Sequence, residues 1–268
     1  MDENTALLLV GVGLVLVLIY LYLGSIEKAL STLGFTKAEV SVILFLTLFL
    51  GWITIPIFPY NGWWVGMSLG GAIIPLAISI YMFKTKRVGL AEGSIGIIIV
   101  TYISYFITRP VEGVGIVADI PIAFAPAIAA GLLSLSVFWM HIGRAAPLAY
   151  ASGVIGTIVG ADLLHLGEVL EFEAPSDGMA ILSIGGANIF DMVYITGLVA
   201  VLIAVFVLWL KKKQENIGAA AAYYEWQQGA EGLPYAKDMT PEPTLFKATS
   251  RPPEKVQTPV EREQRRSQ

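Results

Sequence analysis

The sequence predicts an all-α membrane protein, a polytopic bundle of about seven transmembrane helices. Hydrophobic residues make up 56% of the 268 residues and charged residues only 14%, against roughly 25% charged residues in soluble domains. The apolar residues gather in seven runs, each near the roughly 20 residues that a helix needs to cross the hydrocarbon core. Basic residues, in turn, occur almost only in every second connection between these runs.

The seven runs follow one another along the first four fifths of the chain. Their approximate bounds are 6–23, 40–58, 63–83, 93–108, 121–140, 145–166 and 188–210. The first follows Met1-Asp2-Glu3-Asn4, which lacks the basic n-region of a signal peptide, so we expect it to remain as a helix of the mature protein. Pro75 and Pro126 interrupt the third and fifth runs and predict kinks there.

Positive charges predict the orientation of the bundle. The connections after the first, third, fifth and seventh runs hold nine basic residues, namely Lys28, Lys37, Lys84, Lys86, Arg87, Arg144 and Lys211 to Lys213. The alternate connections hold only Arg109, together with an acidic stretch between the sixth and seventh runs. Because basic residues are retained on the cytoplasmic side, we expect the N-terminus outside, the C-terminus inside and a multi-pass location in the plasma membrane.

The fourth and the last apolar regions have unusual lengths. The fourth has 16 residues between Glu92 and Arg109, which as a helix of about 24 Å is short for a crossing. The last runs for 32 residues from Met179 to Leu210, about 48 Å of helix against a core of about 30 Å. The Gly185-Gly186-Ala187 segment therefore either projects outward or folds back as a re-entrant piece, and we favour the re-entrant segment.

The composition changes after Leu210. Residues 211–268 contain six prolines and no apolar periodicity, which is typical of a disordered polar segment. We therefore divide the chain into a transmembrane domain, 1–210, and a disordered cytoplasmic tail, 211–268, that could recruit a protein partner. The other expected partners are the lipid bilayer and a small solute or ion. Neither region has the basic character of a nucleic-acid binder, and the sequence does not define the oligomeric state.

Glycines at four-residue spacing predict close packing of helices. Gly62, Gly66 and Gly70 have this spacing, as do Gly156 and Gly160 just before Asp162. Such small residues let two helix backbones approach closely, and a tightly packed sixth run would hold Asp162 in place. The segment Ser68-Leu69-Gly70-Gly71-Ala72 is also similar to Ser183-Ile184-Gly185-Gly186-Ala187. We attribute this similarity to the Gly-rich composition of the chain.

Asp162 and Asp191 are the acidic residues that interrupt the long apolar regions. A charged side chain at the centre of a membrane helix costs roughly 2.5 to 3.5 kcal/mol, so one that survives usually lines a cavity, a relay or a binding site. His165 follows Asp162 by three residues and Asn188 precedes Asp191 by three, so antiparallel runs six and seven can present facing polar rows. Asp162, Asp191, His165 and Asn188 are thus candidates for proton or ion binding.

Three interpretations of this group remain open. A proton- or cation-coupled transporter or permease would use the Asp162/Asp191 pair to bind a cation or to carry the coupling proton, and we favour it. An intramembrane aspartyl protease would use the same pair as its catalytic dyad. A structural membrane subunit would need Asp191 only as the cap of the last helix.

The sequence weakens the enzymatic interpretation and gives no support for a cofactor. Presenilin-like proteases carry a Gly-x-Gly-Asp motif and a later Pro-Ala-Leu element, whereas here Gly185-Gly186-Ala187 stands four residues too early and Pro-Ala-Leu is absent. No fourth ligand accompanies Asp162, His165 and Asp191, so we expect no metal site. Cysteine is absent, which excludes disulfides, thiolate metal sites and cysteine nucleophiles.

The glycine-rich blocks resemble an uncharacterised family of membrane proteins, DUF1614. The resemblance rests on residues 153–164, on 183–187 with Phe190-Asp191, and on Ile55-Pro56 and 70–75. It covers about residues 50 to 205 and implies a membrane fold with no established activity. Asn188 stands where the resemblance leads us to expect glycine.

Overall fold

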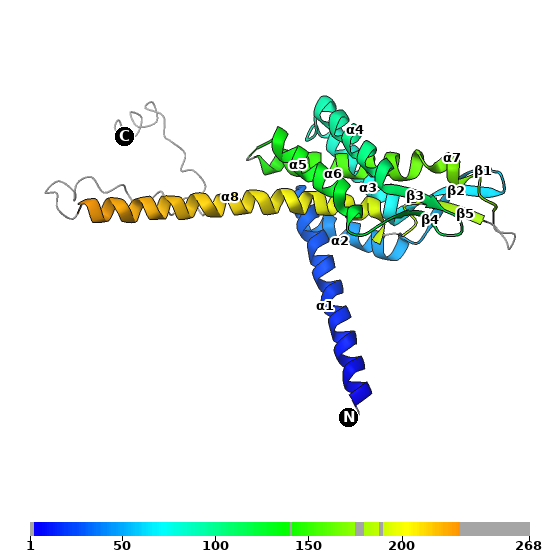
Figure 1. The fold of residues 1–268 in the computed structure, drawn as a ribbon, viewed down its shortest axis with the longest axis horizontal. Helices are drawn as coiled ribbons and strands as arrows, with labels where there is room; N and C mark the ends of the chain where they lie inside the picture. Colours follow the sequence, from blue (N-terminus) through cyan, green and yellow to red (C-terminus); the bar gives the residue numbers. More distant parts are fainter. Residues whose placement is uncertain (1–2, 140, 175–179, 188–189, 231–268) are drawn as a thin grey trace, which may run out of the picture. The chain divides into compact units, whose positions relative to one another are not determined.

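The computed structural model describes residues 3–139, 141–174, 180–187 and 190–230 (Figure 1). The chain divides into two compact units, Met1–Lys212 and Lys213–Gln268. Helices dominate the described residues, which also form a three-stranded and a two-stranded sheet. The predicted all-α class therefore holds for the helical body and misses these two small sheets.

Four helical segments are long and apolar enough to cross a membrane: Leu8–Thr32, Leu90–Ile107, Ile142–Val169 and Met192–Glu215. They belong to α1 (Glu3–Thr32), α4 (Leu90–Ile107), α6 with α7 (Ile142–Thr157 and Leu166–Val169) and α8 (Met192–Ala230). The other helices are shorter: α2 (Lys37–Phe45), α3 (Ile74–Lys84), the 3-10 turn η3 (Ile122–Phe124) and α5 (Ala125–Val137). Each predicted span thus contains a helix, and seven crossings remain a prediction.

Three of these helices carry a π-helical segment, whose wider turn is frequent at functional sites. The segment η1 (Leu46–Leu50) continues α2, η2 (Leu69–Ile73) precedes α3, and η4 (Ile158–Leu163) continues α6. The last of them contains Asp162. The helical geometry therefore changes at the point where the candidate carboxylate is placed.

The second and third predicted spans are part helix and part strand. The helix formed by α2 and η1 ends at Leu50, and β1 (Thr54–Tyr60) then pairs antiparallel with β2 (Trp63–Ser68). Asn61 and Gly62 form the turn with φ values of 46° and 83°, as a two-residue type I′ hairpin requires. Two prolines within β1 exclude a helical interior at this place.

The hairpin gives the first glycine series, Gly62, Gly66 and Gly70, a structural role that differs from the predicted helix packing. Gly62 lies in the turn and Gly66 in β2, so neither packs two helices together as their spacing predicts. A Cβ at Gly66 would lie 2.7 Å from the carbonyl oxygen of Ile55, so the glycine permits a close approach of two strands. Gly70 is buried in η2.

The prolines expected to kink helices stand where the helical geometry changes. Pro75 and Pro126 are the second residues of α3 and α5, directly after the π-helical η2 and the 3-10 turn η3. A proline fits there because its fixed φ is helical and its missing N–H has no partner within the helix in any case. Each proline therefore lies inside a longer helical segment, Leu69–Lys84 or Ile122–Val137, and the predicted kinks stay a prediction.

A third strand joins the hairpin and brings the two similar Gly-Gly-Ala segments side by side. The strand β5 (Ala180–Ile184) pairs parallel with β2, in the sheet order β1-β2-β5. Gly185 follows with a φ of 71°, and a Cβ there would lie 2.6 Å from the backbone nitrogen of Ala72. Only glycine fits this position. Residues 180–184 of the expected re-entrant segment are therefore extended, whereas residues 179, 188 and 189 lie outside the described ranges.

A second hairpin connects α4 to η3 and α5. Its strands, β3 (Thr108–Val111) and β4 (Gly115–Ala118), pair antiparallel. Arg109 and Asp119 form a bidentate ion pair beside the strands, with both N–O distances at 3.1 Å. This hairpin carries charged residues, unlike the first.

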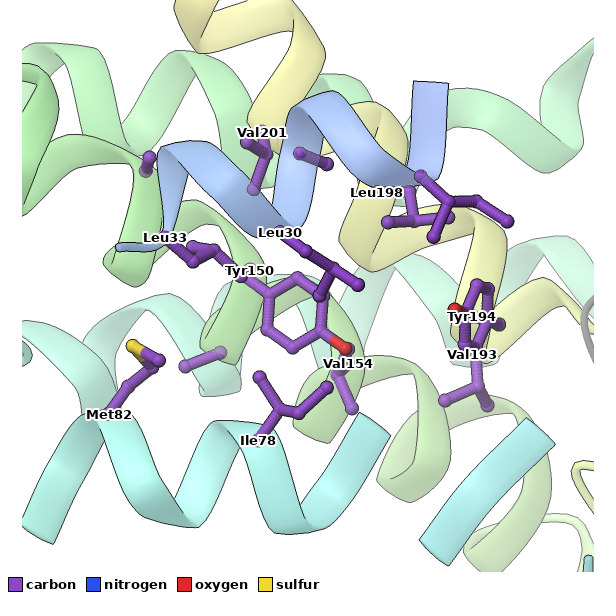
Figure 2. Packing of buried hydrophobic residues seen from close by; sticks show 14 of the residues in the cluster. Leu30, Leu33, Ile78, Met82, Tyr150, Val154, Val193, Tyr194, Leu198 and Val201 are labelled. Carbon is purple, nitrogen blue, oxygen red and sulfur yellow. The ribbon is translucent and has the colours of Figure 1, made fainter. Parts of the chain in front are cut away.

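The core of the first unit surrounds α6. Tyr150 and Val154 of α6 are buried against Leu30 of α1 and Ile78 of α3, with Leu198 of α8 in the same cluster (Figure 2). Small residues of α6 allow its neighbours to approach: a Cβ at Gly153 would lie 3.3 Å from the Thr196 side chain. The helix that carries η4 is therefore the most enclosed of the candidate spans.

The helix α8 continues through residues 211–230, where the sequence predicts a disordered tail. Its lysines, glutamine and alanines beyond Leu210 are good helix formers, so the local sequence favours continuation of the helix beyond the apolar run. The rest of the predicted tail, 231–268, lies outside the described residues.

Candidate functional site

Asp191 caps the N-terminus of α8. Its Oδ1 accepts a hydrogen bond from the backbone N–H of Val193 at 2.9 Å, and its Oδ2 accepts one from Ala187 at 3.3 Å. The first is the bond of an N-cap aspartate, which pairs one of the free N–H groups of the first turn. The second ties the Gly-Gly-Ala block to the same carboxylate. Both oxygens of Asp191 thus have structural partners.

Asp162 lies in η4 with one oxygen that has no partner. The residue is partly buried, and its Oδ2 is fully buried with no hydrogen bond to any described residue. Asp162 is close enough to Asp191 for their charges to interact, so the structure brings the two predicted carboxylates into one neighbourhood. A buried carboxylate oxygen without a donor is costly, which makes Asp162 the unusual member of the pair.

The second glycine series lies against α4. A Cβ at Gly156 would lie 2.5 Å from Cβ of Val100, and a Cβ at Gly160 would lie 2.3 Å from the carbonyl oxygen of Thr101. The backbones of η4 and α4 therefore touch, which holds the turn that carries Asp162. The hydroxyl oxygen of Thr101 is also buried with no hydrogen bond to a described residue.

Each of the two touching segments therefore carries a buried polar atom without a partner among the described residues, Asp162 Oδ2 on η4 and the Thr101 hydroxyl on α4. Sequence reasoning finds the carboxylate because it is charged, and it misses Thr101 because a threonine hydroxyl usually bonds to a carbonyl of its own helix. The signal that identifies Thr101 is structural, namely the close backbone contact with Gly160.

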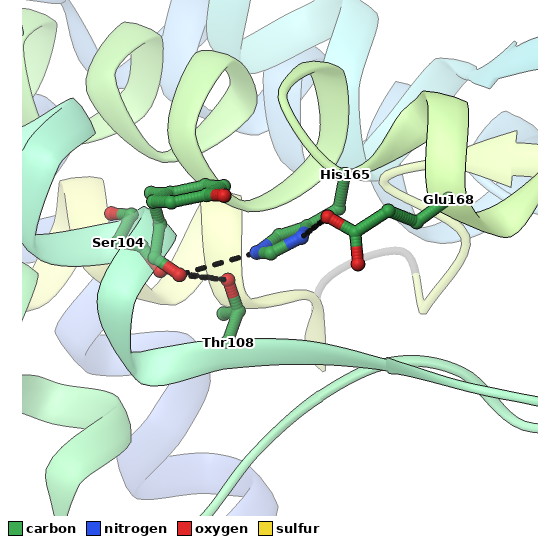
Figure 3. A network of polar contacts seen from close by, with 5 residues as sticks. Ser104, Thr108, His165 and Glu168 are labelled. Atoms are coloured by element: carbon green, nitrogen blue, oxygen red, sulfur yellow. Dashed lines mark hydrogen bonds and ion pairs between the residues drawn. The ribbon is translucent and has the colours of Figure 1, made fainter.

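His165 points toward α4 and belongs to a separate network (Figure 3). Its ring stacks on Tyr105 with centroids 4.6 Å apart, Nε2 lies 3.2 Å from the carbonyl oxygen of Tyr105, and Nδ1 lies 3.2 Å from Oε1 of Glu168. The Thr108 hydroxyl donates to the carbonyl of Ser104 beside it. The described contacts of His165 thus lie on α4 and α7, and none is to Asp191.

The two partners of His165 constrain its protons. A backbone carbonyl only accepts, so Nε2 must carry a proton for the contact with Tyr105 to be a hydrogen bond. The contact of Nδ1 with Glu168 then needs either a second proton on the ring or a proton on the carboxyl group. The side chain of His165 is 6% exposed and that of Glu168 54%, so the pair links a buried ring to the surface.

The first turn of α8 also carries a buried tyrosine. Tyr194 is 2% exposed, and its hydroxyl faces the side chain of Thr47 in η1 without a hydrogen bond of normal geometry to any described residue. Thr47 itself donates to the carbonyl of Ile43. The start of α8 therefore lies between η1, through Tyr194, and η4, through Asp191.

Asn188, the fourth predicted binding residue, lies outside the described residues. Among the residues that the structure does describe, no three His, Cys, Asp or Glu side chains are grouped so that they could hold a metal ion. The candidate site consists of Asp162 on η4, Thr101 on the neighbouring helix α4, and Asp191 and Tyr194 at the start of α8. Asp162 and Asp191 lie near helix ends, whereas Thr101 lies inside α4.

Comparison with protein-family models gives a match over most of the chain. A family model described as "Protein of unknown function (DUF1614)" matches residues 30–203, a range that contains Asp162, Asp191 and both Gly-Gly-Ala blocks. No curated protein and no solved structure matches the chain.

Proposed function

The chain is a member of the DUF1614 family, and we propose that it is a proton- or cation-coupled transporter in which Asp162 binds the coupling ion. The family and the apolar helices support a membrane protein in general. The observation that carries the finer proposal is the buried Oδ2 of Asp162, which has no partner among the described residues. Such an oxygen is satisfied by a proton or by a bound cation.

The surroundings of Asp162 suit reversible binding. Thr101, on the helix that η4 touches, has a second buried oxygen without a partner among the described residues. The negative charge of Asp191 favours binding of a cation or a proton at Asp162, since opposite charges attract and like charges repel. Because α4 and η4 touch through Gly160, a change in helix packing would reach Asp162 directly.

Proteolysis has less support than transport. An aspartyl dyad holds its water between two carboxyl groups that share a proton, whereas both oxygens of Asp191 accept backbone hydrogen bonds. A cap is a sufficient reason for an aspartate at this position. A purely structural subunit would explain Asp191 and leave Asp162 without a role.

Reconstitution tests the proposal. The purified protein is placed in liposomes that contain a pH-sensitive dye, and inward gradients of Na⁺ or K⁺ are imposed. We expect cation-dependent proton movement that is lost in Asp162→Asn, which keeps the shape of the side chain and removes its charge. Glu112→Gln, in the exposed β3–β4 turn, is the matched control and should behave as the wild type.

Two outcomes would count against transport. One is the absence of cation-dependent proton movement in the wild type, and the other is an unchanged rate in Asp162→Asn. Cleavage of transmembrane peptides by the wild type but not by Asp191→Asn would instead favour the protease, because asparagine keeps the cap and abolishes the dyad.

A further inference from the structure

The strand β1 exposes apolar side chains on both of its faces. Ile55 is 46% exposed, Ile57 56%, Phe58 40% and Tyr60 58%, although neighbouring side chains of a strand point to opposite faces. A hairpin strand in water normally alternates apolar residues with polar ones. Only Thr54 at the start of β1 is partly buried, so this strand has no face suited to water.

The segment around β1 has no charged residue. Residues 51–68 contain three tryptophans, a tyrosine and a phenylalanine, and no Asp, Glu, Lys or Arg. Tryptophan and tyrosine are enriched where the hydrocarbon meets the lipid headgroups. The second hairpin differs, because Arg109, Glu112 and Asp119 lie in or beside it.

The exposed surface of β1 continues that of the preceding helix. Phe45 is 56% exposed and Phe49 68% in α2 and η1, and Trp52 is 70% exposed between η1 and β1. Where a helix lies in a membrane, an exposed apolar surface of this kind faces lipid. Exposed apolar side chains therefore continue along the chain from the helix into the strand.

The backbone of β1 limits how deep the strand can lie. It is an edge strand among the described residues, where the sheet order is β1-β2-β5 and β1 pairs with β2 alone. Open sheet edges do not occur in the hydrocarbon region, where free N–H and C=O groups have no water. Pro56 and Pro59 have no N–H to leave unpaired, and the remaining groups require headgroups or water within reach.

The tip of the hairpin is held by the rest of the protein. Asn61 Nδ2 donates to the carbonyl oxygen of Leu170 at 3.1 Å, and Trp63 Nε1 donates to that of Phe172 at 3.1 Å. These bonds hold the turn against residues that follow α7. The exposed apolar surface of β1 is thus presented by a supported element.

We propose that β1 and the residues leading into it, 52–60, lie in the lipid headgroup region of one leaflet, with the apolar side chains of β1 in contact with lipid. Lipid is the occupant that fits because this segment is uncharged and aromatic and follows an exposed apolar helix surface along the chain. The hairpin would then anchor β2 and, through β2, the strand β5 that leads to Asp191.

The absence of cysteine allows spin labels to be placed singly. The probe is Ile57→Cys, labelled with a nitroxide in full-length protein reconstituted in phosphatidylcholine vesicles. Ile98→Cys, 67% exposed in the middle of α4, marks the hydrocarbon, and Glu112→Cys marks water. Collisions with oxygen, which concentrates in lipid, are compared with collisions with a water-soluble nickel chelate.

We expect the ratio of oxygen to nickel collisions at position 57 to be several-fold higher than at 112 and lower than at 98. A ratio equal to that at 112 would place β1 in water and overturn the proposal. Low collision rates with both reagents would place a protein, such as a second copy of the chain, on β1 and would also overturn it. Phe58→Cys repeats the test if Ile57→Cys does not fold, because the two side chains are neighbours on the exposed strand.

Discussion

Replacing Asp191 by alanine and by asparagine separates its role as a cap from its role as a charge. Alanine removes both acceptor oxygens, so the N–H groups of Val193 and Ala187 lose their bonds of 2.9 and 3.3 Å. Loss of an N-cap aspartate costs about 0.5 to 2 kcal/mol, and Val193 is buried, so water cannot fully replace the lost acceptor. We expect Asp191→Ala to lower the free energy of unfolding by about 1 to 2 kcal/mol.

Asparagine keeps one carbonyl oxygen in the place of Oδ1 and caps helices as well as aspartate does. It loses the favourable interaction of the charge with the helix dipole, about 0.3 to 1 kcal/mol, and removes the unfavourable interaction with Asp162. These effects oppose each other, but the NH2 group that replaces Oδ2 cannot accept the longer bond from Ala187, so Asp191→Asn should lower the free energy of unfolding by less than about 1 kcal/mol. Unfolding in mixed micelles of a mild detergent and SDS, followed by tryptophan fluorescence, measures both variants. The reasoning is refuted if asparagine destabilises the protein as much as alanine.

Two further predictions concern the packing of η4 and the start of α2. Gly160→Ala should lower the free energy of unfolding by about 1 to 3 kcal/mol, because its Cβ would lie 2.3 Å from the carbonyl oxygen of Thr101. The control is Gly143→Ala, whose Cβ meets nothing within 4 Å and which should be neutral or slightly stabilising. Equal unfolding midpoints for the two variants would contradict the close contact at Gly160. The hydrogen bonds from the backbone and side chain of Thr36 lower the pKa of Glu39. The stability that this capping box contributes is therefore fully present above the ordinary glutamate pKa, and it is lost as the pH falls through the lowered pKa of Glu39. Thr36→Ala removes the hydroxyl and keeps the backbone donor, so it should reduce the difference in unfolding midpoint between about pH 7 and about pH 4 in part, and an unchanged difference would exclude the Thr36 hydroxyl as a source of it.

The helices could be predicted from the sequence more completely than the strands. Apolar runs of transmembrane length locate every long helix, because each crossing must satisfy its backbone within itself. The length of an apolar run does not distinguish a helix from a strand, so residues 40–58 are counted as one span although residues 54–58 belong to β1. Asn61-Gly62 between apolar residues is a strong signal for a hairpin, and Pro56 and Pro59 argue against a helix. A search for turns inside the apolar runs would have found β1 and β2.

The candidate site could be predicted only in part. A carboxylate in an apolar helix is visible in any sequence, and an aspartate before a long apolar run predicts an N-cap, which describes Asp191. The unpaired state of Asp162 and Thr101 depends on contacts between residues far apart in the chain. The parallel pairing of β2 with β5 is equally non-local, and no local pattern identifies it.

The two similar Gly-Gly-Ala segments explain how the start of α8 is positioned. Each follows a strand of the same sheet, β2 or β5, and each precedes a helix, α3 or α8. Gly185 packs against Ala72 of the first segment, and two residues later the N–H of Ala187 donates to Asp191. The pairing of β2 with β5 therefore positions Asp191, whose negative charge interacts with Asp162. Substitutions in the first Gly-Gly-Ala segment, residues 70–72, can thus shift Asp191 without contacting it. They act through the backbone contact between Gly185 and Ala72, which leaves no room for a larger side chain.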